Sequence, residues 1–378
     1  MTKARNENSH DQQDKKAPLH KVPLIMFVVT TLIVLTVVPW YGLVYGYTWG
    51  AFVTAFVLFI LTGISITAGY HRLWSHSTYK AHWIARCLFA LFGGMALQNS
   101  ILYWAANHRT HHRHVDDNDK DPYSAKKGFW YSHLGWMIRE YPQTLPDYKN
   151  VPDLKRDPIV MFQDKYYLLF GIVANILIPM LIGFAIGDVW GCVLIAGFTR
   201  IVAVHHVTFF INSWAHMWGS QPYTDENTAR DNWLLAIFSF GEGYHNYHHI
   251  FQNDYRNGIR WYHFDPSKWL IKSLEKMGLA YDLKKVNSFK IKRQMLEMKF
   301  KRLEQRQHLM SETLKQIIEL EYEHYKQTLS EWTHLQSNRC EQSMDTIRKK
   351  WQDSIHELED TLIGQYQRLK VIFKQHDA

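Results

Sequence analysis

The sequence predicts an all-α integral membrane protein, with a bundle of four transmembrane helices, a histidine-rich cytoplasmic cap and a coiled-coil-like helical extension. Four apolar runs are each long enough to cross about 30 Å of hydrocarbon. Three histidine clusters lie near the ends of apolar segments. The last quarter of the chain has no proline and little glycine, and apolar residues recur there every three or four positions, which is typical of long packed helices.

The first two spans are expected at about residues 24–45 and 51–68. Residues 1–22 are polar and rich in lysine, which predicts a disordered tail. Because basic residues favour the cytoplasmic side, this tail places the start of the first span in the cytoplasm. The hairpin of two spans then returns the chain to the cytoplasmic side at the first histidine cluster.

Residues 83–104 are apolar, but Arg86, Gln98 and Asn99 interrupt them. They form either another span or a buried or interfacial helix. We favour the second interpretation, because a span would put the first two histidine clusters on opposite sides of the membrane. The third and fourth spans are expected at about 166–190 and 191–211, and they bring the third cluster back to the cytoplasmic side.

The histidine clusters have a spacing that suits metal binding. The second cluster holds His108, His111 and His112, which share one face of a helix because they lie three and four residues apart. Imidazole is a ligand for Zn, Cu, Fe and Ni. A single histidine is more often structural, but three clusters separated by apolar segments favour a metal site. The other two clusters are His71 with His76, and His245 with His248 and His249.

Composition narrows the class of protein further. The formal charge of +8 fits an anionic membrane surface better than nucleic acid, because the chain also carries the apolar runs. The three cysteines, Cys87, Cys192 and Cys340, have no paired spacing. The sequence therefore predicts no disulfide framework, zinc ribbon or iron–sulfur cluster. It also has no dinucleotide-binding glycine motif, so we expect any electrons to come from another protein.

The residues around the clusters resemble a known family. The motifs at 69–76, 119–123, 128–136, 212–216 and 241–249 are similar to those of the membrane-bound acyl-lipid and acyl-CoA desaturases, the stearoyl-CoA desaturase family. The resemblance extends from about residue 23 to 282 and is closest to the bacterial Δ9 branch. It implies an integral membrane protein of the bacterial inner membrane, with both termini and the active site in the cytoplasm.

The resemblance also implies a reaction and its cofactor. The expected reaction uses O2 to introduce a cis double bond at Δ9 into a saturated acyl chain, with two iron ions and two electrons from an external ferredoxin-, rubredoxin- or cytochrome b5-like donor. It adds His216 as a ninth ligand and Asn212 as a contact through water. The full expected ligand set is His71, His76, His108, His111, His112, His216, His245, His248 and His249.

Nearby carboxylates and a few other residues complete the candidate site. Glu242 is expected to hold a ligand ring in place, and Asp116 and Asp121 either do the same or cap turns. Trp104 and Phe209 are candidates for the wall of an acyl tunnel, with ordinary packing as the alternative.

Four cations are candidates for contact with coenzyme A phosphates, namely Arg109, Lys126, Lys127 and Arg139. Anionic lipid is an equal alternative for the two lysines. Glu140 departs from the basic residue of vertebrate relatives, so the headgroup stays open between coenzyme A, a phospholipid and a carrier protein. Hydroxylation of the chain, or zinc binding without catalysis, are the rival functions.

Residues 286–378 are expected to form a long helix or a coiled-coil hairpin outside the resemblance, after a membrane domain at 23–282. Either this extension packs on itself or it mediates self-association or partner docking. Its predicted apolar seam is Leu296, Phe300, Leu303, Met310, Leu314 and Ile317.

Overall fold

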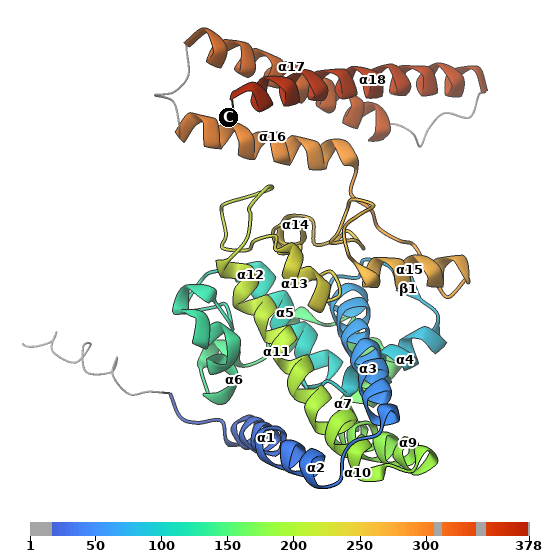
Figure 1. The fold of residues 1–378 in the computed structure, drawn as a ribbon. Helices are drawn as coiled ribbons and strands as arrows, with labels where there is room; N and C mark the ends of the chain where they lie inside the picture. The colour runs from blue at the N-terminus through green and yellow to red at the C-terminus, as the bar shows by residue number, and fades with distance from the viewer. Residues whose placement is uncertain (1–16, 306–311, 338–344, 377–378) are drawn as a thin grey trace, which may run out of the picture. The chain divides into compact units, whose positions relative to one another are not determined.

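The computed structural model describes residues 17–305, 312–337 and 345–376 (Figure 1). Internal contacts divide the chain into two compact units. The first, which we call the membrane unit, comprises Met1–Gln221 and Glu226–Lys285. The second, the C-terminal unit, comprises Pro222–Asp225 and Val286–Ala378. Most of the predicted tail at 1–22 lies outside the described residues, and the described chain is helical from Lys21.

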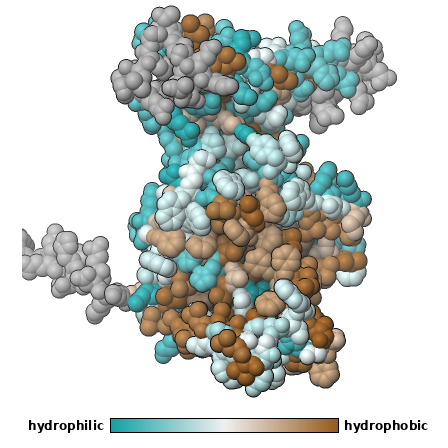
Figure 2. Space-filling view, in the orientation of Figure 1, coloured by the Kyte–Doolittle hydropathy of each residue, from teal (hydrophilic) through white to brown (hydrophobic). Residues whose placement is uncertain are grey.

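The membrane unit contains four helices that are long and apolar enough to cross a membrane, which confirms the predicted fold class. They span Lys21–Val44, Trp49–Ser75, Tyr167–Ile186 and Val189–Met217. Large apolar side chains on them face outward, including Leu43 at 89% and Phe184 at 79% exposure. Figure 2 shows such apolar side chains, in brown, over much of the visible face of this unit. In water this surface would be unfavourable, whereas in lipid it is the expected one.

Each long helix is assembled from consecutive helical segments. The first contains α1 (Lys21–Leu32), η1 (Ile33–Val37) and α2 (Val38–Val44); the second contains α3 (Trp49–Ile64) and η2 (Ser65–Ser75). The third contains α8 (Tyr167–Ile172), η8 (Val173–Leu177) and α9 (Ile178–Ile186). The fourth contains α10 (Val189–Gly191), η9 (Cys192–Thr199), α11 (Arg200–Asn212) and α12 (Trp214–Met217). Helices α3 and α11 pack side by side (Figure 1).

The interrupted apolar segment at 83–104 does not form one long helix. Its first part, α4 (Trp83–Gly94), has 12 residues, which is about 18 Å and too short for a bilayer core of about 30 Å. The chain then turns at Leu97 and Asn99, both with positive φ, before α5 begins at Ile101. The structure therefore agrees with the interpretation that these residues do not cross the membrane.

The remaining elements form the cap of the membrane unit. The helices that matter for the site are α5 (Ile101–His114), α14 (His245–Ile250) and α15 (Pro266–Lys276). Strands β1 (Lys80–Ala81) and β2 (Ala280–Tyr281) pair antiparallel. The other helices are η3 (Ala125–Lys127), η4 (Tyr131–Gly135), α6 (Trp136–Ile138), η5 (Pro142–Thr144), η6 (Tyr148–Asn150), η7 (Leu154–Arg156), α7 (Pro158–Lys165) and α13 (Trp233–Phe238).

The C-terminal unit is built from α16 (Ser288–Gln305), α17 (Glu312–Ser337) and α18 (Asp345–His376). Its core includes Leu296, Tyr325 and Leu362, each at most 1% exposed. The single apolar seam predicted from the sequence is wrong at Ile317, which is 47% exposed, whereas the next residue, Ile318, is buried. The seam assumed one uninterrupted helix, but its residues Phe300 and Ile317 belong to two different helices, α16 and α17, which pack against each other through Phe300 and Tyr322. Met310 of that seam lies outside the described residues.

Candidate metal centre

Nine histidine side chains of the membrane unit form two groups, each with ligand atoms close enough to share one metal ion. Within each group these atoms lie within 4.8 Å of one another. The first group is His71, His76, His108, His112 and His248. The second group is His111, His216, His245 and His249. The structure thus brings together all nine histidines that the sequence analysis named.

Four separate helical elements deliver these rings. Helix α5 gives His108 and His112 to the first group and His111 to the second, so one helix face serves both groups. Helix α14 is divided in the same way: it gives His248 to the first group, where it meets His112 of α5, and His245 and His249 to the second, where His249 meets His111 of α5. The segment η2 is a π-helix in which the His76 N–H donates to the His71 carbonyl (3.1 Å). Its wider turn puts residues five apart on nearly one face, which an α-helix would not do.

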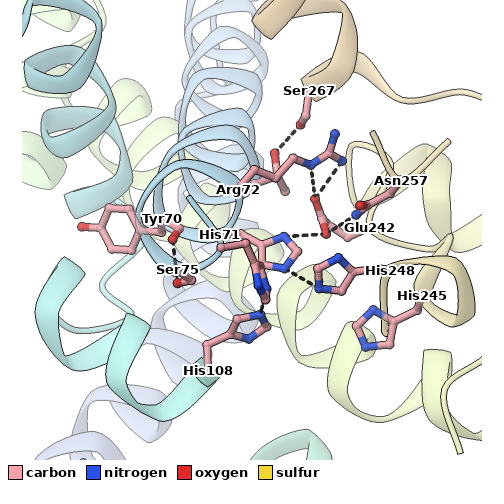
Figure 3. A network of polar contacts seen from close by, with 12 residues as sticks. Tyr70, His71, Arg72, Ser75, His108, Glu242, His245, His248, Asn257 and Ser267 are labelled. Carbon is pink, nitrogen blue, oxygen red and sulfur yellow. Dashed lines mark hydrogen bonds and ion pairs between the residues drawn. The ribbon is translucent and has the colours of Figure 1, made fainter. Parts of the chain in front are cut away.

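Within each group, the Nε2 atoms of the histidine rings face one another. His71 Nε2 lies 2.9 Å from His248 Nε2, and His76 Nε2 lies 2.8 Å from His108 Nε2. In the second group, His245 Nε2 lies 3.1 Å from His216 Nε2. Figure 3 shows three rings of the first group, His71, His108 and His248, close together, with His71 directed at His248. Converging lone pairs of this kind are the arrangement that a metal ion requires.

Carboxylates and hydroxyls hold the second nitrogen of several rings. His71 Nδ1 lies 2.8 Å from Glu242 Oε2, and His111 Nδ1 lies 2.9 Å from Asp121 Oδ1. A carboxylate only accepts, so these contacts place the hydrogen on Nδ1 and leave Nε2 free for a metal. Asp121 also accepts from the Asp116 and Tyr123 backbone N–H groups, so it caps the turn as well.

Asp116 acts on the second group indirectly, through Thr228. Its Oδ1 accepts from the Thr228 hydroxyl (2.7 Å), and that hydroxyl lies 2.8 Å from His216 Nδ1. Asp116 can reach Thr228 because it has a positive φ of 67° directly after α5, a conformation that aspartate tolerates. The sequence analysis named Asp116 but missed Thr228, whose separation of twelve residues from His216 gives no periodic signal.

The electrostatics of the groups favour neutral imidazole. Burial lowers the pKa of six of the ligands well below the ordinary value, and neighbouring histidines add to the effect. Burial raises the pKa of Glu242, but His71 and Arg72 outweigh it, and the net pKa is lowered. Neutral imidazole beside an ionised carboxylate is the state that binds a cation. The six histidines are His76, His108, His112, His245, His248 and His249.

A cavity of about 440 Å³ reaches both groups. Its wall includes His71 and His108 of the first group and His111 and His245 of the second. Most of the rest of the wall is apolar or aromatic, and it includes residues of α1 such as Phe27. The cavity has the size and lining of a site for an apolar ligand that is held beside bound metal.

Comparison with known proteins identifies the family. A family model described as "Fatty acid desaturase" matches residues 47–284. This chain belongs to the fatty acid desaturase family. With its four apolar spans, it is an integral membrane protein. The family match covers the histidine groups and ends before helix α16.

Individual relatives extend this result. The chain is 45% identical to "Acyl-CoA desaturase 1" of Saccharomyces cerevisiae over 245 residues, 64% of this chain and 47% of that protein. It is 37% identical to "Stearoyl-CoA desaturase 5" of Bos taurus over 248 residues, 64% and 72% of the two chains. It is 36% identical to "sn-2 palmitoyl-lipid 9-desaturase" of Nostoc sp. over 247 residues, 64% and 82%.

The coverage of the yeast protein and the identities to the yeast and Nostoc proteins add two findings. This chain covers about half the length of the yeast protein. The yeast relative is also more similar than the Nostoc one, so the comparisons do not favour the bacterial branch expected from the sequence.

The two residues predicted to form a tunnel wall, Trp104 and Phe209, line the cavity. Trp104 stacks on His108 with ring centroids 4.8 Å apart, and Phe209 lies in the wall together with Asn212. Several polar residues of the wall were not predicted from the sequence, among them Gln98, Asn107 and Thr208. The Gln98 amide donates to the Thr208 hydroxyl (2.9 Å) across 110 residues of sequence, which no local pattern reveals.

Asn107 is the most informative of the missed residues. It is 3% exposed, and among the described residues its side chain interacts with the Tyr103 hydroxyl without a hydrogen bond of good geometry. A buried amide that is not fully satisfied is unfavourable, so its place in the wall suits a polar group of a ligand. Its position directly before His108 was the available signal in the sequence.

The structure does not bring the four predicted cations to the cavity wall. Arg109 pairs with Asp153 and donates to the carbonyls of Trp74, Ser75 and Asn150, which uses its donors inside the cap. Arg139 donates to the Ala17 carbonyl (2.6 Å) and thereby holds the chain before α1.

The two lysines are exposed, and Lys127 Nζ lies 5.0 Å from the Tyr131 ring centre. His114, considered as a further ligand, joins neither histidine group.

Proposed function

We propose that this protein is a fatty acyl desaturase that uses O2 to convert a –CH2–CH2– unit of a saturated acyl chain into a cis –CH=CH– unit. The observation that carries the proposal is the cavity whose largely apolar wall reaches both groups of converging imidazoles. The balanced reaction consumes O2, two electrons and two protons, and releases two molecules of water. An alkyl chain offers nothing for an acid, base or nucleophile to act on, so a metal cofactor must supply the oxidising step.

The residues fit a pair of iron ions. Imidazole is an established ligand type for iron, and the nine rings are buried or half-buried and converge in two groups. Iron bound there supplies the reduction of O2 that hydrogen removal requires. The protein itself holds the rings through Glu242, Asp121 and Thr228, and it shields the centre from water by burial.

The cavity is proposed to hold the acyl chain. Apolar walls bind the methylenes, and Trp104 beside His108 places them at the centre. The Gln98–Thr208 hydrogen bond ties the turn after α4 to α11 and maintains the shape of the wall. The shape of such a cavity sets which carbon pair meets the centre.

The proposed substrate is an acyl-CoA, oxidised at Δ9. The names of the yeast and Bos taurus relatives support the CoA ester, and the Nostoc name supports position 9. The Nostoc protein acts on a lipid, so an acyl-lipid is the alternative headgroup. Two electrons come from an external ferredoxin-, rubredoxin- or cytochrome b5-like protein, and the centre faces the cytoplasm, as do both termini.

The test is the fatty-acid profile of an aerated host that supplies a donor, with and without the full chain. We expect monounsaturated acyl chains to rise, and His111→Ala to abolish the rise. His356→Ala is the matched control, because His356 is an exposed histidine of the C-terminal unit. An unchanged profile from a metal-loaded wild-type chain would contradict the proposal, and alcohols instead of alkenes would identify a hydroxylase.

A further inference from the structure

Arg72 lies next to His71 in the chain, and its guanidinium is buried between two carboxylates. Only 1% of the residue is exposed. Its Nη2 lies 3.0 Å from Glu242 Oε1 and 3.0 Å from Asp265 Oδ1. Its Nη1 donates to Asp265 Oδ2 (3.1 Å). Figure 3 shows Arg72 directed at Glu242, on the side away from the histidine rings.

Glu242 connects this arginine to the first histidine group. Its Oε2 lies 2.8 Å from His71 Nδ1 and accepts from Asn257 Nδ2 at 2.7 Å. Its Oε1 accepts from Arg72 Nε and Nη2. Each carboxylate oxygen therefore has two donors, which sets the rotation of the carboxylate. That rotation sets the plane of the His71 ring and hence the direction of Nε2.

Asp265 anchors the other side of Arg72. It is fully buried and accepts from the backbone N–H groups of Asn257 (3.0 Å), Gly258 (3.0 Å) and Lys268 (2.9 Å). The Lys268 contact caps the N-terminus of α15. Arg72 also donates to the Tyr255 carbonyl (2.9 Å). The arginine thus ties the loop before α15 to the metal side of the network.

The network is balanced in charge. Arg72 and Lys268 carry the positive charges, and Glu242 and Asp265 the negative ones. All four are at least nine-tenths buried. Removing one member of a buried ionic set leaves an unpaired charge, which is strongly unfavourable. Loss of the Asp265 charge should therefore change the position of the Glu242 carboxylate, because Arg72 contacts both carboxylates.

Backbone packing gives independent support. Gly241 has φ +102°, and a Cβ there would lie 2.5 Å from Asp265 Oδ1. A Cβ at Gly243 would lie 2.2 Å from the Ala236 nitrogen. Gly241 therefore allows the chain just before Glu242 to approach Asp265 closely, and Gly243 allows the chain just after it to approach Ala236. Close packing on both sides of Glu242 thus restricts its position relative to Asp265.

We propose that Arg72 and Asp265 are positioning residues for the metal ion of the first histidine group. Asp265 orients the guanidinium, the guanidinium holds the Glu242 carboxylate, and the carboxylate aims His71 Nε2 at the ion. The inference rests on the proposed function only in that the first group binds metal. The second group has its own partners, Asp121 and Thr228, and does not depend on this chain of contacts.

The primary test is Asp265→Asn, which keeps the size of the side chain and removes its charge. Metal per full-length chain is measured by emission spectroscopy after equilibration with a series of chelator concentrations, and the thermal midpoint is measured in parallel. We expect one of the two ions to be held about 10–100-fold more weakly, the usual size of such an effect, and the other to be unchanged.

Asp157→Asn is the matched control. Asp157, like Asp265, precedes a proline, caps a helix and pairs with an arginine, Arg86. It contacts no histidine of either group among the described residues. We expect this variant to keep both ions at wild-type affinity. An equal loss of metal in Asp157→Asn would show a general effect of destabilising the cap and would overturn the proposal.

A double-mutant cycle separates positioning from stability. If Asp265 acts through Glu242, then Asp265→Asn should change metal affinity by less than about 3-fold in a Glu242→Gln background. Arg72→Lys, which keeps the charge without the fork, should give an intermediate loss. Additive losses, or wild-type affinity in Asp265→Asn, would refute the inference. A wild-type chain that binds two ions but desaturates nothing would instead refute the proposed function and leave this inference standing.

Discussion

The nine histidines differ in what holds the nitrogen that faces away from the centre. His71 and His111 each meet a buried carboxylate, whereas His216 meets a hydroxyl that is itself held by Asp116. A ring held by an ionised group is a stronger donor to the metal than one held by a neutral group. At the scale of single residues, the two groups should therefore respond differently when an outer partner is removed.

Thr228→Val tests the neutral partner of His216. Valine has nearly the same shape but lacks the hydroxyl, so His216 Nδ1 and Asp116 both lose a hydrogen bond. We expect the second ion to be held about 10-fold more weakly, measured as metal per chain against a chelator series. Thr333→Val in the C-terminal unit is the control, since its hydroxyl bonds only within α17 among the described contacts. Unchanged metal content in Thr228→Val would contradict this role.

His133 gives a pH dependence that is separate from metal binding. Burial lowers its pKa to about 4, and His206 adds to the shift. The unfolded chain takes up a proton near pH 6.5, whereas the folded chain does not until about pH 4. Above pH ~6.5 the ring is neutral in both states, so His133 does not affect the free energy of unfolding. Between pH ~6.5 and about 4 only the unfolded chain binds the proton, so the free energy of unfolding decreases as the pH falls.

His133→Gln should make unfolding less sensitive to pH in this window. The measurement compares the free energy of unfolding at about pH 7 and pH 5 for the wild type and the variant, both free of metal. We expect the loss on acidification to be smaller in His133→Gln. The other histidines are present in both proteins, so they cancel in the comparison. An equal loss in both would show that His133 is not the group responsible.

At the scale of elements, α5 and α14 each divide their histidines between the two groups, while η2 gives both of its histidines to the first. The first two use α-helical spacing, and the third uses the wider turn of a π-helix.

The C-terminal helices follow a simpler rule, in which one face of each helix is buried against the others. Glu321 pairs with Arg368 and Trp332 with Glu359, so α17 and α18 run antiparallel.

Leu362→Ala should destabilise the C-terminal unit. Leu362 is fully buried in its core, and truncating such a leucine costs about 2–5 kcal/mol. Its neighbour Ile363 is 44% exposed, so Ile363→Ala is a control expected to cost less than about 1 kcal/mol. Hydrogen exchange of the α17 and α18 amides in the full chain measures both. Equal protection in the two variants would contradict the packing described for this unit.

At the scale of the whole molecule, metal binding and folding of the membrane unit are linked. The nine ligands come from segments far apart in the sequence, such as His71 and His248, which are separated by 177 residues, so the site exists only in the folded chain. A ligand that binds the folded state alone stabilises it, by about 2.7 kcal/mol at a hundred times its dissociation constant.

Metal removal should therefore act on one unit and not on the other. We expect a chelator to lower the thermal midpoint of the full chain and to increase hydrogen exchange in α5 and α14. Exchange in α17 and α18 should stay the same, because no histidine of either group lies in the described C-terminal unit. Restored protection on adding iron is the control. Equal deprotection of both units would show that metal is not bound at the histidine groups.

Local patterns in the sequence were enough for much of this architecture. Hydropathy runs placed the four spans, because a bilayer demands a continuous apolar stretch from each helix. Helical periodicity placed His108, His111 and His112 on one face, and the motif resemblance indicated the family and added His216. The prediction that Ile317 belongs to the apolar seam was wrong, because periodicity does not show which residues belong to one helix and which to the next.

The sequence by itself determined the fold class and the family, and it predicted eight of the nine histidines from clusters within short windows. The ninth, His216, was predicted from the family resemblance alone. Only the tertiary structure decided how the nine histidines divide into two groups and that the four predicted cations lie outside the cavity wall. It alone showed that Arg72 links Glu242 to Asp265. The physical reason is that these contacts join segments far apart along the chain. Their geometry depends on how helices pack, and no single stretch of sequence carries that information.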